Sequence, residues 1–193
     1  MRLTPQLLLN AYSQGIFPMA DEDGTIYWYD PDPRAIIPLD KFHVPHSLAR
    51  TIRRGNFEVR VDTTFRAVME ACAEPTPGRE ITWINAEIIE AYSELHMLGF
   101  AHSVETWIEG ELSGGLYGVA LGGLFAGESM FSWATDSSKV ALVYLVERLR
   151  QGGFCLLDTQ FMTDHLRRFE AIEISRQEYR ARLAYALTVR ARF

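Results

Sequence analysis

The sequence predicts an α+β fold in which an antiparallel meander of three strands is flanked by helices. The meander is indicated by three consecutive segments with strand-like patterning, separated by short glycine-containing turns. Segments with apolar residues three and four positions apart, which is typical of helices, lie on both sides of it. The predicted strands are residues 101–108, 112–120 and 122–132, and the turns are Glu109-Gly110 and Gly122-Gly123.

Capping residues and glycines mark the elements before the meander. Thr4 and Pro5 begin a helix that Gly15 ends, and Thr63 and Asn85 are helix caps. The expected elements are a helix from Pro5 to Gly15, strands at 26–30 and 34–39, a helix at 46–54, a strand at 57–60, a helix after Thr63, and a helix after Asn85 that ends at Gly99.

The elements after the meander alternate between helix and strand. They are a helix from Asp136 to Gly152, a strand at 154–160, a helix at 161–169, a strand at 172–174 and a helix from Ser175 to about Val189. This order is close to that of a GNAT-type acyltransferase core. We therefore expect a GNAT-like domain over residues 41–193, with a small N-terminal α/β attachment, residues 1–40, packed on it.

The composition excludes several classes of protein. A chain of 193 residues that is 48% hydrophobic can bury a substantial core. Its N-terminal leucine run, Leu7 to Leu9, is too short for a secretory signal or a membrane span, so a cytoplasmic protein is expected. Cys72 and Cys155 are far apart and lie among apolar residues, which predicts two buried reduced thiols.

The charge distribution restricts any nucleic-acid contact to a local patch. The net charge of −6 argues against a protein that coats nucleic acid indiscriminately. Residues 41–60, however, hold five Lys/Arg against one acid, and Arg50, Arg53 and Arg54 are spaced along one side of a helix. The alternative is a solvated basic helix face. His43 and His46 have no third ligand at suitable spacing, so no metal site is expected.

Three polar residues stand in otherwise apolar strands. Asp158 and Gln160 are two residues apart and should share a strand face; the alternative to a catalytic role is a buried polar pair bonded to backbone or to a neighbouring loop. Glu128 should share a face with Leu124, Met130 and Ser132. A carboxylate there needs a partner, such as an internal arginine, or its pKa rises.

Five segments resemble, in order, the leucyl/phenylalanyl-tRNA–protein transferase family. They are AYSQGIFPM, WYDPDPRAII, TWINAEIIEAYSELHMLGFAHSVETW, GGLYGVALGGLFAGESMFS and LLDTQFMTDHL, which together cover most of the chain. The GESMFS block followed about thirty residues later by a D-x-Q strand is specific. Differences are Tyr29, where many relatives have tryptophan, Leu116, where methionine is expected, and a Gly-Gly-Asp-Leu segment that often precedes the first block in relatives.

The resemblance implies a reaction and the residues that carry it. Leucine or phenylalanine, and less well methionine, would pass from aminoacyl-tRNA to the α-amine of proteins with N-terminal Arg or Lys, marking them for degradation without metal or coenzyme A. Asp158 and Gln160 would form the catalytic relay. An amide is scarcely basic, so Gln160 would orient the amine while Asp158 supplies negative charge. Glu128 would bind the acceptor's N-terminal Arg or Lys side chain.

The resemblance also implies where the donor binds. Strand alternation should not place all four candidates for the aminoacyl pocket on one wall, and Met130 is favoured because it is expected on the face of Glu128. Aromatic residues would stack on the 3′-terminal adenosine, and the basic helix would contact the tRNA backbone. The candidates are Leu116, Phe125, Met130 and Leu157 for the pocket, Trp28, Trp83 and Tyr92 for stacking, and Arg50, Arg53 and Arg54 for the backbone.

Three alternative functions fit these residues less well. A coenzyme-A-dependent GNAT N-acyltransferase grips pyrophosphate with a glycine-rich Q/R-x-x-G-x-G/A loop, whereas the comparable junction here reads FSWATDSSKVAL. A non-catalytic tRNA-binding module would keep the basic helix but has no reason to combine Glu128, Asp158 and Gln160. A serine hydrolase elbow ends in glycine, where this chain has Phe131.

Overall fold

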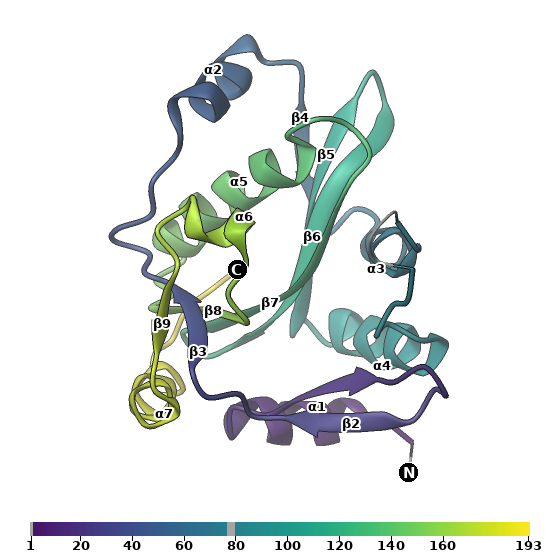
Figure 1. Cartoon of the computed structure of the whole chain (residues 1–193), viewed down its shortest axis with the longest axis vertical. Coiled ribbons are helices and arrows are strands. Elements are labelled where there is room, and N and C mark those ends of the chain that lie inside the picture. The colour runs from purple at the N-terminus through teal and green to yellow at the C-terminus, as the bar shows by residue number, and fades with distance from the viewer. Residues whose placement is uncertain (1, 77–79) are drawn as a thin grey trace.

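A mixed sheet forms the centre of the computed structural model, which describes residues 2–76 and 80–193 (Figure 1). Its strand order is β4-β5-β6-β7-β8-β3-β9, and each neighbouring pair is antiparallel except β7 and β8. The strands are β3 (Arg34–Ile37), β4 (Glu58–Val61), β5 (Ala101–Ile108), β6 (Glu111–Leu121), β7 (Leu124–Ser132), β8 (Leu156–Gln160) and β9 (Ile172–Ile174). The predicted α+β class and the β5-β6-β7 meander are confirmed.

Helices cover both faces of this sheet. Figure 1 shows α5 and α6 on one side, and α3 and α4 on the other, where α1 and a hairpin of β1 and β2 also pack. The helices are α1 (Pro5–Ser13), α2 (His46–Arg54), α3 (Phe65–Ala73), α4 (Ala86–Met97), α5 (Ser137–Gln151), α6 (Asp164–Arg167) and α7 (Arg176–Ala186); the hairpin strands are β1 (Phe17–Ala20) and β2 (Ile26–Tyr29). No helix in the described part of the chain is long and apolar enough to cross a membrane.

Three of the predicted helix starts are confirmed by side-chain caps. The side chains of Thr4, Asn85 and Ser175 accept hydrogen bonds from the first turns of α1, α4 and α7. The cap predicted at Thr63 is wrong, because Thr64 occupies that position. Thr63 instead donates its hydroxyl and backbone N–H to the buried carboxylate of Glu105, which needs these donors.

Other differences lie at element ends. Helix α6 is shorter than predicted because Thr163 caps it, and α7 ends at Ala186. The strand β1 was not predicted, since FPMA shows no clear alternation. The prediction for Cys72 is confirmed, whereas Cys155 is exposed because it lies in the turn before β8 rather than within the sheet.

The N-terminal segment contributes directly to the central sheet. Strand β3, which precedes the predicted division at residue 40, pairs with β8 on one side and with β9 on the other. The rest of the segment packs through α1 against α4 and β6. The residues before position 40 therefore lie close to the strands that carry the predicted site.

Strands β7 and β8 separate partway along their length. Their pairing begins at Leu124 with Leu156 and reaches no further than Ala126 with Asp158. Just beyond, β7 has a β-bulge, because Gly118 of β6 pairs with Gly127 whereas Tyr117 pairs with Ser129, leaving Glu128 as the extra residue. A Cβ at Gly118 would meet the carbonyl oxygen of Ala126 at 2.4 Å, so only glycine fits opposite the bulge.

Candidate active site

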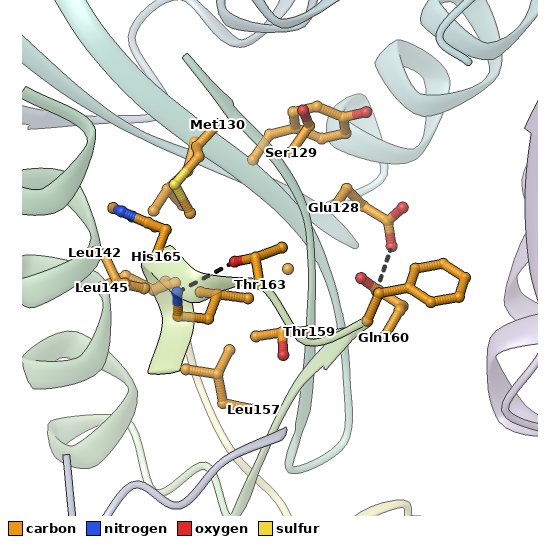
Figure 2. A pocket seen from close by; sticks show the side chains of 15 residues that line it. Glu128, Ser129, Met130, Leu142, Leu145, Leu157, Thr159, Gln160, Thr163 and His165 are labelled. Carbon is orange, nitrogen blue, oxygen red and sulfur yellow. Dashed lines mark hydrogen bonds between the residues drawn. The ribbon is translucent and has the colours of Figure 1, made fainter. Parts of the chain in front are cut away.

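A pocket of about 310 Å³ opens where β7 and β8 separate (Figure 2). Figure 2 shows Glu128 and Gln160 together on one side, and Met130, Leu142 and Leu145 on the other. One wall of the pocket is therefore apolar, and one edge carries a carboxylate and an amide. The lining residues are Leu116, Tyr117, Gly127, Glu128, Ser129, Met130, Leu142, Leu145, Leu157, Thr159, Gln160, Phe161, Thr163, His165 and Leu166.

The four candidates for the aminoacyl pocket lie together. Leu116, Met130 and Leu157 line the pocket, while Phe125 is buried behind them in the same apolar cluster. The expectation that the four would not all share one wall is confirmed, since Phe125 does not line the pocket. The bulge at Glu128 nevertheless changes the phase of β7. Phe125 and Met130, an odd number of residues apart, thereby face the same side.

The same bulge corrects the expected surroundings of Glu128. Leu124 belongs to the cluster against α7, whereas Met130 packs on the opposite face against α5. The prediction that Glu128, Met130 and Ser132 share a face is therefore wrong. Glu128 points towards α1, where Tyr12 is its hydrogen-bond donor, and Met130 reaches the pocket from the other face of the strand.

Glu128 is held by hydroxyl and amide donors rather than by an arginine. The Tyr12 hydroxyl donates to Oε1 of Glu128 at 2.6 Å, and Nε2 of Gln160 donates to the same oxygen at 3.4 Å. Burial, together with the charge of Asp158, raises the pKa of Glu128 to about 8. This carboxyl group is therefore largely protonated at neutral pH.

Asp158 lies behind the pocket in a buried ion pair. Arg34 donates Nε to Oδ1 at 2.9 Å and Nη2 to Oδ2 at 2.6 Å, and the hydroxyl of Tyr179 donates to Oδ2 at 2.9 Å. Burial disfavours the charged guanidinium, but the hydrogen bonds and charge of Asp158 outweigh this effect and raise the pKa of Arg34. Asp158 does not line the pocket.

Gln160 connects Asp158 to Glu128. Its backbone N–H donates to Oδ1 of Asp158 at 2.9 Å, and its side-chain amide donates to Glu128. Its φ of +59° lies in the left-handed region, which is unusual for a residue other than glycine. The three polar residues singled out in the sequence are thus brought together, with Gln160 in the middle.

The three predicted stacking residues differ in exposure. Trp28 is 39% exposed on β2 opposite Pro18, and Trp83 is half-buried, with its carbonyl bonded to the N–H of Ala20. Tyr92 is completely buried, and its hydroxyl lies 2.5 Å from that of Tyr12. The stacking role predicted for Tyr92 is therefore wrong, because no face of its ring is accessible to a base.

The basic helix α2 presents its arginines to solvent. Arg50, Arg53 and Arg54 are exposed, and none of them forms an ion pair among the described residues, whereas Arg60 pairs with Glu58. In the described ranges 2–76 and 80–193, no group of three His, Cys, Asp or Glu residues could hold a metal ion.

Several residues of this site were not singled out from the sequence. Arg34 could have been found, because a lone arginine in the apolar strand RAII must have a buried partner. Tyr12, Tyr179 and His165 gave no such signal, since each lies on a helix whose pattern is ordinary. The hydroxyls of Tyr117 and Thr159 and Nε2 of His165 are buried polar atoms without a partner in the described structure, and all three residues line the pocket.

An apolar pocket edged by a buried carboxyl group of raised pKa is typical of an enzyme. Comparison with known proteins specifies its class. A model described as "Leucyl/phenylalanyl-tRNA protein transferase" matches residues 36–184, and the model of that family's N-terminal domain matches residues 1–32. The chain is therefore an aminoacyltransferase, and it belongs to the leucyl/phenylalanyl-tRNA protein transferase family.

Curated relatives carry the same family name. The chain is 66% identical over 193 residues to the leucyl/phenylalanyl-tRNA–protein transferase of Herpetosiphon aurantiacus, covering 100% of this chain and 98% of that one. It is 59% identical to that of Paramagnetospirillum magneticum, covering 99% and 92%, and 55% identical to that of Gloeobacter violaceus, covering 99% and 97%.

Two solved structures show distant similarity to the chain. L-PGS from Bacillus licheniformis aligns at 15% identity and a TM-score of 0.46, covering 79% of this chain and 51% of that one. A putative acetyltransferase of the GNAT family from Desulfovibrio desulfuricans aligns at 16% identity and a TM-score of 0.38, covering 52% and 70%. Alignments at this level do not assign a fold, so the GNAT-like layout stays a prediction.

Proposed function

We propose that this enzyme transfers leucine or phenylalanine, and less well methionine, from aminoacyl-tRNA to the α-amine of proteins with N-terminal arginine or lysine. The observation that carries the proposal is the pocket itself, which joins an apolar wall to an edge formed by Gln160 and Glu128. The apolar wall suits the donor side chain, and the polar edge suits a cationic acceptor. Such a reaction marks acceptor proteins for degradation in the cytoplasm.

In the proposed reaction the acceptor nitrogen attacks the ester carbonyl carbon of the charged tRNA. The new C–N bond becomes a peptide bond, the C–O bond to the terminal ribose breaks, and the proton lost by the amine passes to the ribose oxygen of the leaving tRNA. Gln160 orients the amine, since its amide lies at the pocket edge and is not basic. Asp158 fixes Gln160 from behind and supplies negative charge. Positioning of this kind can lower a barrier by roughly 7–11 kcal/mol.

Donor and acceptor approach the pocket from different parts of the fold. Leu116, Met130 and Leu157 hold the donor side chain, with Phe125 behind them. Trp28 and Trp83 stack on the terminal adenosine of tRNA. The hairpin that carries Trp28 reaches the pocket rim, because Phe17 of β1 packs edge-on against Phe161 at 5.9 Å between ring centroids.

A coenzyme-A-dependent reaction is disfavoured by the start of α5. Asp136 occupies the N-cap position there, with a left-handed φ of +67°, and it pairs with Lys139 at 2.6 Å. A helix N-terminus binds pyrophosphate through free backbone N–H groups and positive potential, and a carboxylate at the cap opposes an anion.

The reaction is tested with radiolabelled leucyl-tRNA and a peptide that begins with arginine. Wild-type enzyme is expected to label the peptide, and Glu128→Ala is expected to raise the KM for the peptide with a smaller change in kcat, because it removes a contact to the acceptor. A matched peptide with an acetylated N-terminus should stay unlabelled. Folded wild-type protein that binds charged tRNA but labels no peptide would contradict the proposed reaction and favour a tRNA-binding module.

The exposed arginines of α2 are expected to contact the tRNA backbone. Replacing Arg50, Arg53 and Arg54 together by alanine should weaken tRNA binding at low salt and reduce the slope of log Kd against log salt concentration by about two to three. Replacing Arg66, Arg180 and Arg182, which form surface ion pairs, serves as a control for net charge. Equal slopes for both triple variants would show that only overall charge matters.

A further inference from the structure

Arg34 is the largest side chain that the fold buries completely. It is 1% exposed, its guanidinium lies over the rings of Phe17 and Tyr179, and Nη1 donates to the carbonyl oxygen of Gly15 at 2.8 Å. Burying a guanidinium is costly unless hydrogen bonds satisfy it. The two bonds to Asp158 and the one to Gly15 provide this, so Arg34 joins the end of α1 to the end of β8.

The carboxylate of Asp158 has no free hydrogen-bonding capacity. Oδ1 accepts from Nε of Arg34 and from the backbone N–H of Gln160, and Oδ2 accepts from Nη2 of Arg34 and from the hydroxyl of Tyr179. A carboxylate offers about four lone-pair sites, and these four donors use them. Taking a proton from an acceptor amine would require Asp158 to give up one of these bonds. Its route to the reaction is therefore through Gln160.

Two chains of hydrogen bonds fix Gln160 relative to α1. One runs from the carbonyl of Gly15 through Arg34 and Asp158 to the backbone N–H of Gln160. The other runs from Tyr12 of α1 through Glu128 to the side-chain amide of Gln160. Both ends of this residue are thus held, and its strained left-handed backbone is maintained by the first chain.

We infer that Arg34 and Tyr179 are positioning residues of the transfer reaction, acting on Gln160 through Asp158. The N-terminal segment that contains α1 and Arg34 is then part of the catalytic assembly and not only an attachment. This inference rests on the proposed role of Gln160. The competing view is that Arg34, Asp158 and Tyr179 form a buried network that stabilises the fold and does not affect transfer beyond stability.

A double-mutant cycle between Tyr179→Phe and Gln160→Ala distinguishes the two views. Tyr179→Phe keeps the ring under Arg34 and removes one donor to the carboxylate. It is expected to lower kcat about tenfold, the loss expected for one hydrogen bond to a charged group, with the KM of both substrates within about twofold. In the Gln160→Ala background the same change should alter kcat by less than about twofold.

Leu183→Val serves as the stability control. Leu183 is buried one turn further along α7, in the cluster that contains Tyr179, and makes no hydrogen bond to Asp158 through its side chain. The Tm of the Leu183→Val variant should fall at least as far as that of Tyr179→Phe, and its kcat should stay within about twofold of wild type. The inference is overturned if the loss of kcat in Tyr179→Phe and in Leu183→Val is proportional to the loss of Tm. It is also overturned if Tyr179→Phe lowers kcat as much in the Gln160→Ala enzyme as in wild type.

Amide hydrogen exchange of Gln160, measured by NMR, tests the inference without the reaction. Tyr179→Phe is expected to speed exchange of the Gln160 N–H by about tenfold, because it loosens the carboxylate that accepts this bond, whereas Leu183→Val should not do so selectively. Unchanged exchange would overturn the inference even in an active enzyme. If Tyr179→Phe speeds exchange of the Gln160 N–H but the wild-type enzyme shows no transfer, the positioning of Gln160 is retained and the proposed function is rejected.

Discussion

Asp158→Ala is expected to abolish measurable transfer and to lower the free energy of unfolding by about 3–5 kcal/mol. The loss of stability follows because the guanidinium of Arg34 is left buried without its anionic partner. The loss of activity follows because the backbone N–H of Gln160 loses its acceptor, and misplacing a reacting group by about 1 Å can cost roughly 100-fold in rate. Urea unfolding and the leucine-transfer assay measure the two effects on the same preparation.

The double variant Arg34→Met, Asp158→Leu separates the loss of stability from the loss of activity. Replacing a buried ion pair by apolar residues of similar volume is often neutral or stabilising, so the double variant should recover most of the lost stability. It should remain inactive, since Gln160 is still unsupported. Recovery of transfer along with stability would show that the ion pair has no part in the reaction.

Selectivity for an arginine acceptor is expected to rise roughly tenfold or more between pH 6.5 and pH 9. Glu128 has a pKa of about 8, mainly through burial, and only its ionised form can pair with a guanidinium. The measurement is the ratio of kcat/KM for peptides that begin with arginine and with citrulline, its neutral isostere. Both peptides carry the same α-amine, so the titration of that amine largely cancels in the ratio.

Glu128→Gln is the matched control. Its ratio of kcat/KM for the arginine and citrulline peptides should not change between pH 6.5 and pH 9. Stability gives an independent check on the same group. Because the folded-state pKa is raised, the protonated carboxyl contributes stability that is fully present below its ordinary pKa of 4.5 and is lost as the pH rises through about 8. Wild type should therefore lose Tm relative to Glu128→Gln between pH 5 and pH 9. A wild-type selectivity ratio that is independent of pH would contradict the assignment of Glu128 as the acceptor-binding residue.

Local sequence signals predicted the elements of the fold well where a cap or turn is chemically specific. Asn85 and Ser175 mark helix starts because their side chains satisfy free backbone N–H groups in the first turn. The meander followed from glycine turns and alternation. The cap predicted at Thr63 is wrong because a distant carboxylate, Glu105, accepts a hydrogen bond from its hydroxyl. No local sequence pattern reveals such a partner.

The chemistry of the site could be predicted only in part. Asp158, Gln160 and Glu128 stand out as polar residues in apolar strands, and the structure brings them together. The bulge at Glu128 could not be predicted, since it is a property of the pairing between β6 and β7 and not of β7 alone. It moves Met130 to the face opposite Glu128. Tyr92 was misassigned because a buried and an exposed aromatic residue look alike in sequence.

The position of β3 has a consequence for how the chain is made. This strand lies between β8 and β9, so its first sheet partner is about 120 residues away in sequence. At roughly 5–20 residues per second, the ribosome releases β3 many seconds before β8 exists. During that time the apolar side chains of Ala35, Ile36 and Ile37, all buried in the finished protein, have no sheet to join. The end of the sheet that holds β8, β3 and β9 is therefore completed late in synthesis, and until then these apolar side chains of the nascent chain lack their sheet partners.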